Sequence, residues 1–434
     1  MLVIAPSNYG YPNLTMVKAP TARASAIDMM HSSSRSTGVI GPISGLDHAD
    51  VADRFTRLAR VGPAARVGFR PAAGTHRWVY ETEVAHRVME LPTPTDPAAL
   101  LTEFREPSIQ LARVGVAGEY FLFDYNHGIG DIALLSRFLE VMLCGVDPQR
   151  PDLWTAHGRV IPPLVAAAAR TYAVNPKRLL DMAWWYRRSG RPQPKPTAIA
   201  PTPPVDRSIG VPSTATARIS AAALDELRLW RDDHQPGVSV VVLVVLALRH
   251  ALEKAGIATT DRVTLPFDAR VYLPKSRRTL ANFAAGLDFD YRDSVSPQGL
   301  QHAITEAFAI GRPVANLVIS NLKVQANRLP GLSPTTPSSA PTRTERRASL
   351  LYSSLNRVPR DIAIPWADTA PAQFLVASDP AGPDAITVTS AIADGDLTMT
   401  AVFHDSVFDQ KSVSAALTHA ATDTAALVDP GSAH

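Results

Sequence analysis

His127 and Asp131 stand four positions apart and together could carry acid–base chemistry. A neutral imidazole with an ordinary pKa of about 6.5 can take a proton from a hydroxyl or an amine at neutral pH. Gly128 and Gly130 separate the two residues, which lets the backbone bend and lets a reactant approach closely. The spacing therefore predicts that His127 is a general base, held in one ring orientation by its surroundings.

The residues on either side of this pair predict a strand followed by a helix. Residues 121–125 alternate and are rich in aromatic side chains, which is typical of a buried strand. Residues 132–142 place apolar side chains at helical spacing. Asp131 then lies where the helix begins, a favourable position for a carboxylate. The alternative is a loop histidine beside an aspartate that only caps the helix.

This stretch resembles the HHxxxDG signature of the condensation-domain and CoA-dependent acyltransferase superfamily. That superfamily includes chloramphenicol acetyltransferase, nonribosomal peptide condensation domains, wax ester synthases and mycobacterial polyketide-associated acyltransferases. His127 matches the second histidine, which the family uses for catalysis, and Asp131 matches its aspartate. Asn126 stands where the family has its first histidine, and Ile132 stands where it has glycine.

Later segments resemble the family in order and spacing, from about residue 38 to the C-terminus. Residues 265–270 are similar to a strand that ends in an arginine, here Arg270, and Asn282 is similar to the asparagine of a Gly-Asn-Phe segment. Residues 353–359 are similar to a Ser-Asn-Leu-Gly stretch, with Ser354 and Asn356 replacing its Asn and Gly. Residues 393–400 are similar to a late hairpin that reads D-G-x-L.

The resemblance implies an α/β fold, an α+β sandwich of two chloramphenicol-acetyltransferase-like lobes that form a V around an active-site tunnel. It also implies that Asp131 is structural and pairs with an arginine of the other lobe, for which Arg270 is our candidate. The alternative is that Asp131 only caps the helix and that Arg270 lies in solvent. Donors for a developing oxyanion would be the backbone amides of residues 130–132 and the hydroxyl of Ser353 or Ser354. The residues expected to contact substrate are Asn126, Gly128, Gly130, Ile132, Arg270, Asn282 and Asn356.

Composition sets the remaining limits. A net charge of +3 in 434 residues gives no reason to expect a nucleic-acid partner. The single cysteine, Cys144, excludes an intramolecular disulfide and fits a reducing cytoplasm. We expect no signal peptide, no membrane span and no metal site. Residues 184–188, Trp-Trp-Tyr-Arg-Arg, are expected to pack between the lobes because the cluster is short; the alternative is weak contact with a membrane surface.

We expect four parts: a poorly ordered, dispensable extension over 1–36, a first lobe over 37–190, a proline-rich linker over 191–213 and a second lobe over 214–434. Helices are predicted over 47–58, 96–104, 239–253 and 410–428. Three late strands are predicted over 349–353, 385–390 and 397–403.

The function predicted from the resemblance is acyl transfer from a CoA or carrier-protein thioester to a hydroxyl or amine acceptor, in lipid or secondary metabolism. The thioester is a co-substrate, and we expect no other cofactor and a cytoplasmic monomer. One alternative is a free-standing peptide-type condensation enzyme. The other is a non-catalytic docking or binding module that kept the fold, which the substitutions at Asn126, Ile132, Ser354 and Asn356 favour.

Overall fold

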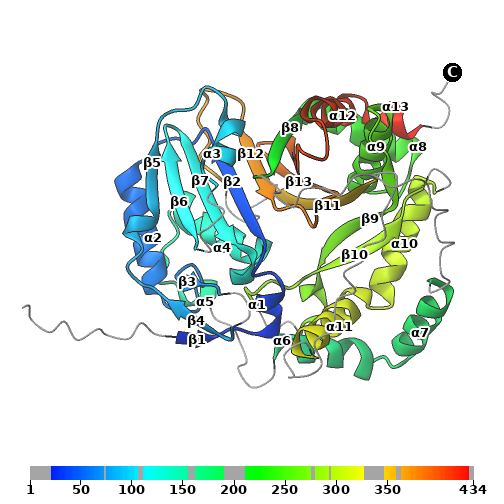
Figure 1. Cartoon of the computed structure of the whole chain (residues 1–434), viewed down its shortest axis with the longest axis horizontal. Coiled ribbons are helices and arrows are strands. Elements are labelled where there is room, and N and C mark those ends of the chain that lie inside the picture. The colour runs from blue at the N-terminus through cyan, green and yellow to red at the C-terminus, as the bar shows by residue number, and fades with distance from the viewer. Residues whose placement is uncertain are drawn as a thin grey trace, which may run out of the picture.

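The computed structural model describes residues 21–72, 75–105, 111–154, 162–189, 211–274, 279–292, 295–326, 347–357 and 363–429. Two α/β halves stand side by side, each built around a mixed sheet (Figure 1). The linker predicted over 191–213 lies outside the described residues except for 211–213, of which Ser213 begins a strand.

The first half contains a sheet of five described strands. Their order is β12 (Gln373–Ser378), β2 (Arg35–Gly41), β7 (Tyr120–Asn126), β6 (Arg113–Ala117) and β5 (Val88–Leu91). All neighbours are antiparallel except β5 and β6. β7 is the strand predicted before the His127 turn, and all seven of its residues are buried.

The second half contains a sheet of six described strands. Their order is β10 (Ala284–Asp290), β9 (Thr259–Asp268), β11 (Ala348–Arg357), β13 (Ala385–Ala393), β14 (Asp396–Phe403) and β8 (Ser213–Ile219). β11 runs parallel to both of its neighbours, and a bulge lies between Ser354 and Asn356. The three predicted late strands are confirmed as parts of β11, β13 and β14.

The chain exchanges a strand between the halves, which the sequence analysis missed. β12 follows β11 in the chain but pairs with β2 of the first sheet, with Ser378 opposite Ser36 (Figure 1). The expected second lobe over 214–434 therefore contributes a strand to the other half, and the boundary at residue 213 does not divide the chain cleanly.

The expectation of a poorly ordered segment over 1–36 is wrong for residues 21–36; residues 1–20 lie outside the described part. β1 (Thr21–Arg23), β4 (Arg77–Tyr80) and β3 (Phe69–Arg70) form a small antiparallel sheet in that order. α1 (Ala26–Met30) begins with a capping box in which Ser25 and Asp28 satisfy each other's backbone N–H groups. Ile27 packs among apolar residues of the second half, so α1 bridges the two halves.

The remaining helices cover the sheets. In the first half and the segment that follows it these are α2 (His48–Arg60), α3 (Leu100–Glu103), α4 (Ile132–Leu143), α5 (Pro151–Trp154), α6 (Pro163–Ala168) and α7 (Lys177–Ser189). In the second half they are α8 (Ala221–His234), α9 (Val240–Lys254), α10 (Pro297–Ala309), α11 (Arg312–Ala326), α12 (Gln410–Thr422) and α13 (Thr424–Val428). Single turns are η1 (Ala85–Arg87), η2 (Pro97–Ala99), η3 (His127–Ile129), the π turn η4 (Ala169–Ala173) and η5 (Ala269–Tyr272).

Most of the predicted helices agree with these bounds. α2 begins after Asp47, whose side chain accepts a hydrogen bond from the Asp50 amide. α9 is buried along most of its length, as its continuous apolar sequence predicts. The helix expected over 410–428 is instead divided at Asp423 into α12 and α13.

Candidate active site

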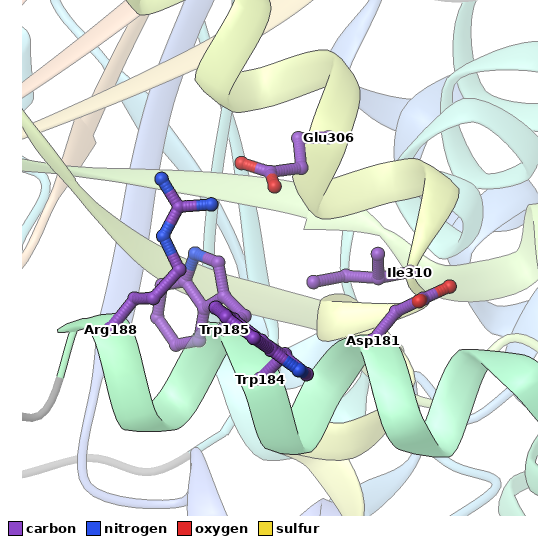
Figure 2. A pocket seen from close by; sticks show the side chains of 6 residues that line it. All are labelled: Asp181, Trp184, Trp185, Arg188, Glu306 and Ile310. Carbon is purple, nitrogen blue, oxygen red and sulfur yellow. The ribbon is translucent and has the colours of Figure 1, made fainter.

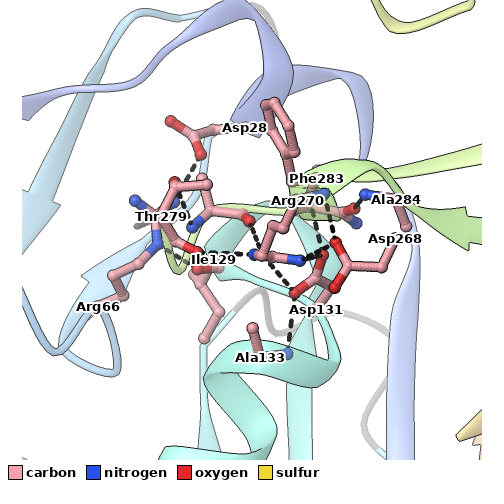
Figure 3. Close-up of polar contacts among 12 residues, drawn as sticks. Asp28, Arg66, Ile129, Asp131, Ala133, Asp268, Arg270, Thr279, Phe283 and Ala284 are labelled. Atoms are coloured by element: carbon pink, nitrogen blue, oxygen red, sulfur yellow. Dashed lines mark hydrogen bonds and ion pairs between the residues drawn. The ribbon is translucent and has the colours of Figure 1, made fainter. Parts of the chain in front are cut away.

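An ion pair between the halves fixes the start of α4. Both carboxylate oxygens of Asp131 bind the Arg270 guanidinium, at 2.8 and 2.9 Å (Figure 3). Asp131 also accepts hydrogen bonds from the amide of Ala133 at 3.0 Å, as helix cap, and of Phe283 at 2.8 Å. Both side chains are largely buried, so the alternative of a solvent-exposed Arg270 is wrong. One carboxylate thus joins the motif turn to η5 and to the segment that leads into β10.

His127 begins the η3 turn at the end of β7, which places its imidazole beside the first residues of the neighbouring strand β2. The Ser36 hydroxyl lies 2.7 Å from His127 Nε2, and the Ser378 hydroxyl lies 2.8 Å from that of Ser36. The two serines face each other because β12 pairs with β2. Neither serine was predicted, since the pairing of β2 with β7 brings Ser36 to the histidine and the strand exchange brings Ser378 to Ser36. The His127 side chain nevertheless remains partly exposed.

The surroundings of His127 favour its neutral form. Burial lowers the pKa of His127 below its usual value of 6.5, with the Gly130 backbone and the Asp131 charge opposing that effect. Nδ1 has no hydrogen-bond partner of ordinary geometry among the described residues. A neutral imidazole keeps one nitrogen free to accept a proton, which a general base requires.

Arg66 holds the His127 turn from outside. Its guanidinium donates to the carbonyl oxygens of Ile129 and, at 3.2 Å, of Gly128, and it binds the Asp28 carboxylate at 2.6 Å (Figure 3). The Arg66 backbone has a left-handed φ of 65°, which costs about 1–2 kcal/mol in a residue other than glycine. These contacts offset that cost and tie α1 to the turn. No local pattern marks Arg66, so the sequence analysis missed it.

We expect Arg66→Ala to lower the free energy of unfolding by about 2–3 kcal/mol, because two carbonyl oxygens and a largely buried carboxylate lose a charged donor. Urea unfolding measures the change. Arg60→Ala is the matched control: Arg60 pairs with Glu83 while both are more than half exposed, so its loss should cost less than about 1 kcal/mol. Equal effects of the two substitutions would contradict a clamping role for Arg66.

The two glycines serve close packing. A Cβ atom on Gly128 would lie 2.8 Å from the Asp28 carbonyl oxygen and 2.9 Å from the Trp78 ring. A Cβ on Gly130 would lie 2.6 Å from the Leu134 side chain. Protein atoms already fill the space on the Cβ side of both glycines, so a side chain would not fit there; the predicted contact of Gly128 and Gly130 with substrate stays a prediction. The glycines let the turn pack against α1 and α4.

Asn126 is also used within the protein. Its side chain accepts a hydrogen bond from the Gly128 amide and donates one to the Ser32 carbonyl oxygen, both at 2.8 Å. The residue is 1% exposed, so it holds the turn against the α1–β2 connection. This position, where the family has its first histidine, is a positioning residue in this structure rather than a substrate contact.

The other predicted residues lie near the turn or apart from it. Ile132 is the first residue of α4, and the Asn282 side chain accepts a hydrogen bond from the Ala284 amide at 3.2 Å, beside Phe283. The Gly130 amide, a predicted oxyanion donor, is directed to the His127 carbonyl oxygen at 3.3 Å.

Three of the predicted residues lie on β11, namely Ser353, Ser354 and Asn356. The Ser354 hydroxyl donates a hydrogen bond to the Asn356 side chain at 3.4 Å. No hydrogen bond of the described residues joins these three to His127, so their predicted roles stay predictions.

A second histidine lies within electrostatic reach of the first. His31 ends α1, and its buried Nε2 has no hydrogen-bond partner among the described residues. The pKa of His31 is lowered to about 4, mainly by burial and also by the nearby His127, while Asp131 and Asp28 oppose this. The sequence analysis set this residue aside with the N-terminal segment, although the Ser25–Asp28 capping signature marks a helix there.

The low pKa of His31 predicts a pH effect on stability. The unfolded chain binds a proton at His31 more tightly than the folded chain does. The free energy of unfolding should therefore be highest above pH 6.5 and should fall as the pH drops toward 4. Between pH 7 and 5 we expect His31→Gln to reduce this loss by about 1–2 kcal/mol, measured by urea unfolding at each pH. His86→Gln is the matched control, because His86 is exposed and its loss should leave the pH dependence of stability unchanged. A His31→Gln protein with the wild-type pH dependence would contradict this assignment.

A cluster of buried charged residues lies near Ser36 and Ser378 and holds their two strands together. Asp124 is fully buried and binds the guanidinium groups of Arg35 and Arg113. Asp379, which follows Ser378, binds Arg105 and accepts a hydrogen bond from the Arg35 amide at 2.9 Å. The cluster therefore locks β12 onto β2 and fixes the register that places Ser378 beside Ser36.

The part of the chain that the structure describes contains no group of three or more His, Cys, Asp or Glu side chains that could hold a metal ion. None of its helices is both long and apolar enough to cross a membrane.

Comparison by sequence finds no matching family model and no matching curated protein. Comparison by structure finds trichothecene 15-O-acetyltransferase from Fusarium sporotrichioides, with a TM-score of 0.58 at 12% identity over 93% of this chain and 95% of that one. Polyketide synthase associated protein 5 from Mycobacterium tuberculosis has a TM-score of 0.52 at 14% identity over 94% and 99% of the two chains. The first condensation domain of the CDA synthetase has a TM-score of 0.54 at 14% identity over 92% and 93%. The chain therefore has the α/β fold of these acetyltransferase and condensation-domain structures.

Proposed function

We propose that the protein is an acyltransferase in which His127 is the general base. It transfers an acyl group from a CoA or carrier-protein thioester to a hydroxyl or amine of a small-molecule acceptor. The observation that carries the proposal is the setting of His127: an imidazole whose pKa is lowered by burial, with a hydrogen bond at Nε2, on a turn that Asp131 ties to both halves of the molecule.

The proposed reaction uses the hydrogen bond that Ser36 makes to Nε2. The acceptor takes the place of the Ser36 hydroxyl at Nε2 and gives its proton to His127 as its oxygen or nitrogen attacks the thioester carbonyl. A new C–O or C–N bond forms, the C–S bond breaks, and the proton passes from His127 to the departing thiolate. Donors near the developing oxyanion would each contribute about 3 kcal/mol.

The two substrates would enter a tunnel between the halves from opposite faces and meet at His127. Carrier proteins or CoA supply the donor, since the neighbours in fold include a protein named for its association with a polyketide synthase and a peptide-synthetase condensation domain. We place the reaction in the cytoplasm, where CoA thioesters are made and where the single Cys144 stays reduced.

The test is an assay of thiol release from a panel of acyl-CoA and acyl-carrier thioesters, with and without alcohol and amine acceptors. We expect thiol release that depends on an acceptor, with the ester or amide identified by mass spectrometry. Release that needs no acceptor would indicate thioester hydrolysis, and no release with any pair would contradict the proposal.

A second candidate is a docking module that binds a carrier or partner protein without chemistry. The Ser36 hydroxyl favours it, because it already occupies the Nε2 hydrogen bond that an acceptor needs. Ser36→Ala separates the two functions. A catalyst should keep turnover within about tenfold and gain acceptor access, whereas a docking module should show no turnover before or after the substitution.

A further inference from the structure

Exposed apolar side chains gather at one end of the second half. Of the twelve large apolar side chains that are exposed in the described residues, nine lie on α6, η4, α7, η5 and α11 or directly after them, and these elements contact one another. The nine are Val165, Val174, Leu179, Leu180, Trp184, Tyr186, Val271, Ile319 and Leu322. Single exposed apolar residues are ordinary on a protein surface, but a concentration of this kind marks an interaction site.

α7 has its apolar face turned outward. Leu180 and Trp184 lie one turn apart and are 69% and 67% exposed, and Leu179 and Tyr186 lie two turns apart on the opposite flank of the exposed side, with Arg187 between the two pairs. The inward side carries the buried Met182 and the half-buried Trp185, which stacks on the Arg312 guanidinium at 3.7 Å. Helix α7 is therefore anchored through one side and presents aromatic and aliphatic groups on the other.

Basic side chains lie on the same elements as the exposed apolar side chains. α7 carries four basic residues and one acidic residue, Asp181. The neighbouring η4 and α11 add Arg170 and Lys323 to the surface, and no other Asp or Glu occurs in the five elements. The face would thus attract an anionic partner.

α7 also stands away from the body of the protein. A groove of about 640 Å³ separates it from α10 and is lined by Asp181, Trp184, Trp185, Arg188, Glu306 and Ile310 (Figure 2). Figure 1 shows α7 at the periphery of the second half. The helix is consequently free to lie along a flat surface without displacing core contacts.

We propose that this face docks on an anionic lipid surface, with α7 lying in the membrane–water interface. An interfacial helix combines exposed apolar and aromatic side chains with lysine or arginine, and α7 carries both on its outward side, with Arg187 between two apolar pairs. A lipid surface suits the face better than a small acidic protein, because the exposed apolar residues are spread over several elements. Docking of this kind is independent of the reaction at His127.

The test is cosedimentation of the full chain with vesicles of phosphatidylcholine alone or mixed equally with phosphatidylglycerol. We expect binding to the anionic vesicles that weakens as salt is raised. Arg187→Gln with Arg188→Gln should reduce binding about 30-fold, because each basic residue near an anionic surface contributes about a fivefold factor. Leu180→Ser with Trp184→Ser should reduce it about tenfold or more.

Leu229→Ser is the matched control, since Leu229 on α8 is 71% exposed and lies outside this face. It should bind vesicles as the wild type does, and unchanged melting temperatures would show that all variants fold. Absence of binding to anionic vesicles at low salt, or equal loss in the Leu229 variant, would overturn the proposal. Binding of an acidic carrier protein through the same residues, without vesicle binding, would also overturn it and assign the face to a protein partner.

Discussion

Asp131→Ala is expected to lower the free energy of unfolding by about 3–5 kcal/mol, because it leaves a largely buried guanidinium without its partner. The loss also removes the acceptor for the amides of Phe283 and Ala133. Two halves of the chain and the start of α4 therefore depend on this one carboxylate. Urea unfolding followed by circular dichroism measures the effect.

A double-mutant cycle tests whether Asp131 and Arg270 act as a pair. Arg270 has other contacts, with Asp268 and with the carbonyl oxygens of Thr279 and Ala281, so the single substitution alone would not isolate the pair. We expect a coupling of at least about 1–3 kcal/mol. The exposed helix pair of Asp225 and Arg228 is the control and should couple by less than about 1 kcal/mol. A coupling near zero between Asp131 and Arg270 would contradict the pairing.

His127→Ala is expected to reduce turnover by about 10²- to 10⁴-fold, the usual contribution of a general base. The Michaelis constants should change little, because proton transfer stabilises the transition state and not the bound substrates. The side chain is partly exposed, so the variant should fold, and the exposed His86→Ala is the matched control. Because the pKa of His127 is lowered, the wild-type rate should fall only at a pH below the usual histidine value of 6.5.

Local pattern was sufficient to predict the elements around the site. β7 and α4 follow from alternating and helical spacing in one continuous stretch, and Asp131 is the helix cap that its position predicts. The resemblance added Arg270, which is 139 residues away and which no local pattern could connect to Asp131.

The strand exchange could not be predicted in the same way. Residues 373–378 form a short apolar run between loops, and their partner β2 lies more than 300 residues earlier in the chain. Ser378 reaches Ser36 only through that pairing, and Ser36 reaches His127 through the pairing of β2 with β7, which lies more than 80 residues later. Arg66 is a similar case, because a left-handed backbone at an arginine has no sequence signature.

Composition misled the analysis of the N-terminal segment. Few acids and many serines suggested an extension without structure, yet Ser25 and Asp28 form a capping box. A four-residue pattern of this kind outweighs average composition, since it satisfies specific backbone groups at the first turn. Recognising it would have predicted the helix that carries Asp28, but not its contact with the His127 turn.

The most direct test of the central claim is a single-turnover measurement of acyl transfer with enzyme in excess over a bound thioester. Rapid mixing with a saturating acceptor separates the chemical step from product release. We predict rapid formation of the ester or amide by the wild type, and formation slowed by at least about 10²-fold in His127→Ala with the thioester still bound. Equal rates in the two proteins would contradict the assignment of His127 as the base.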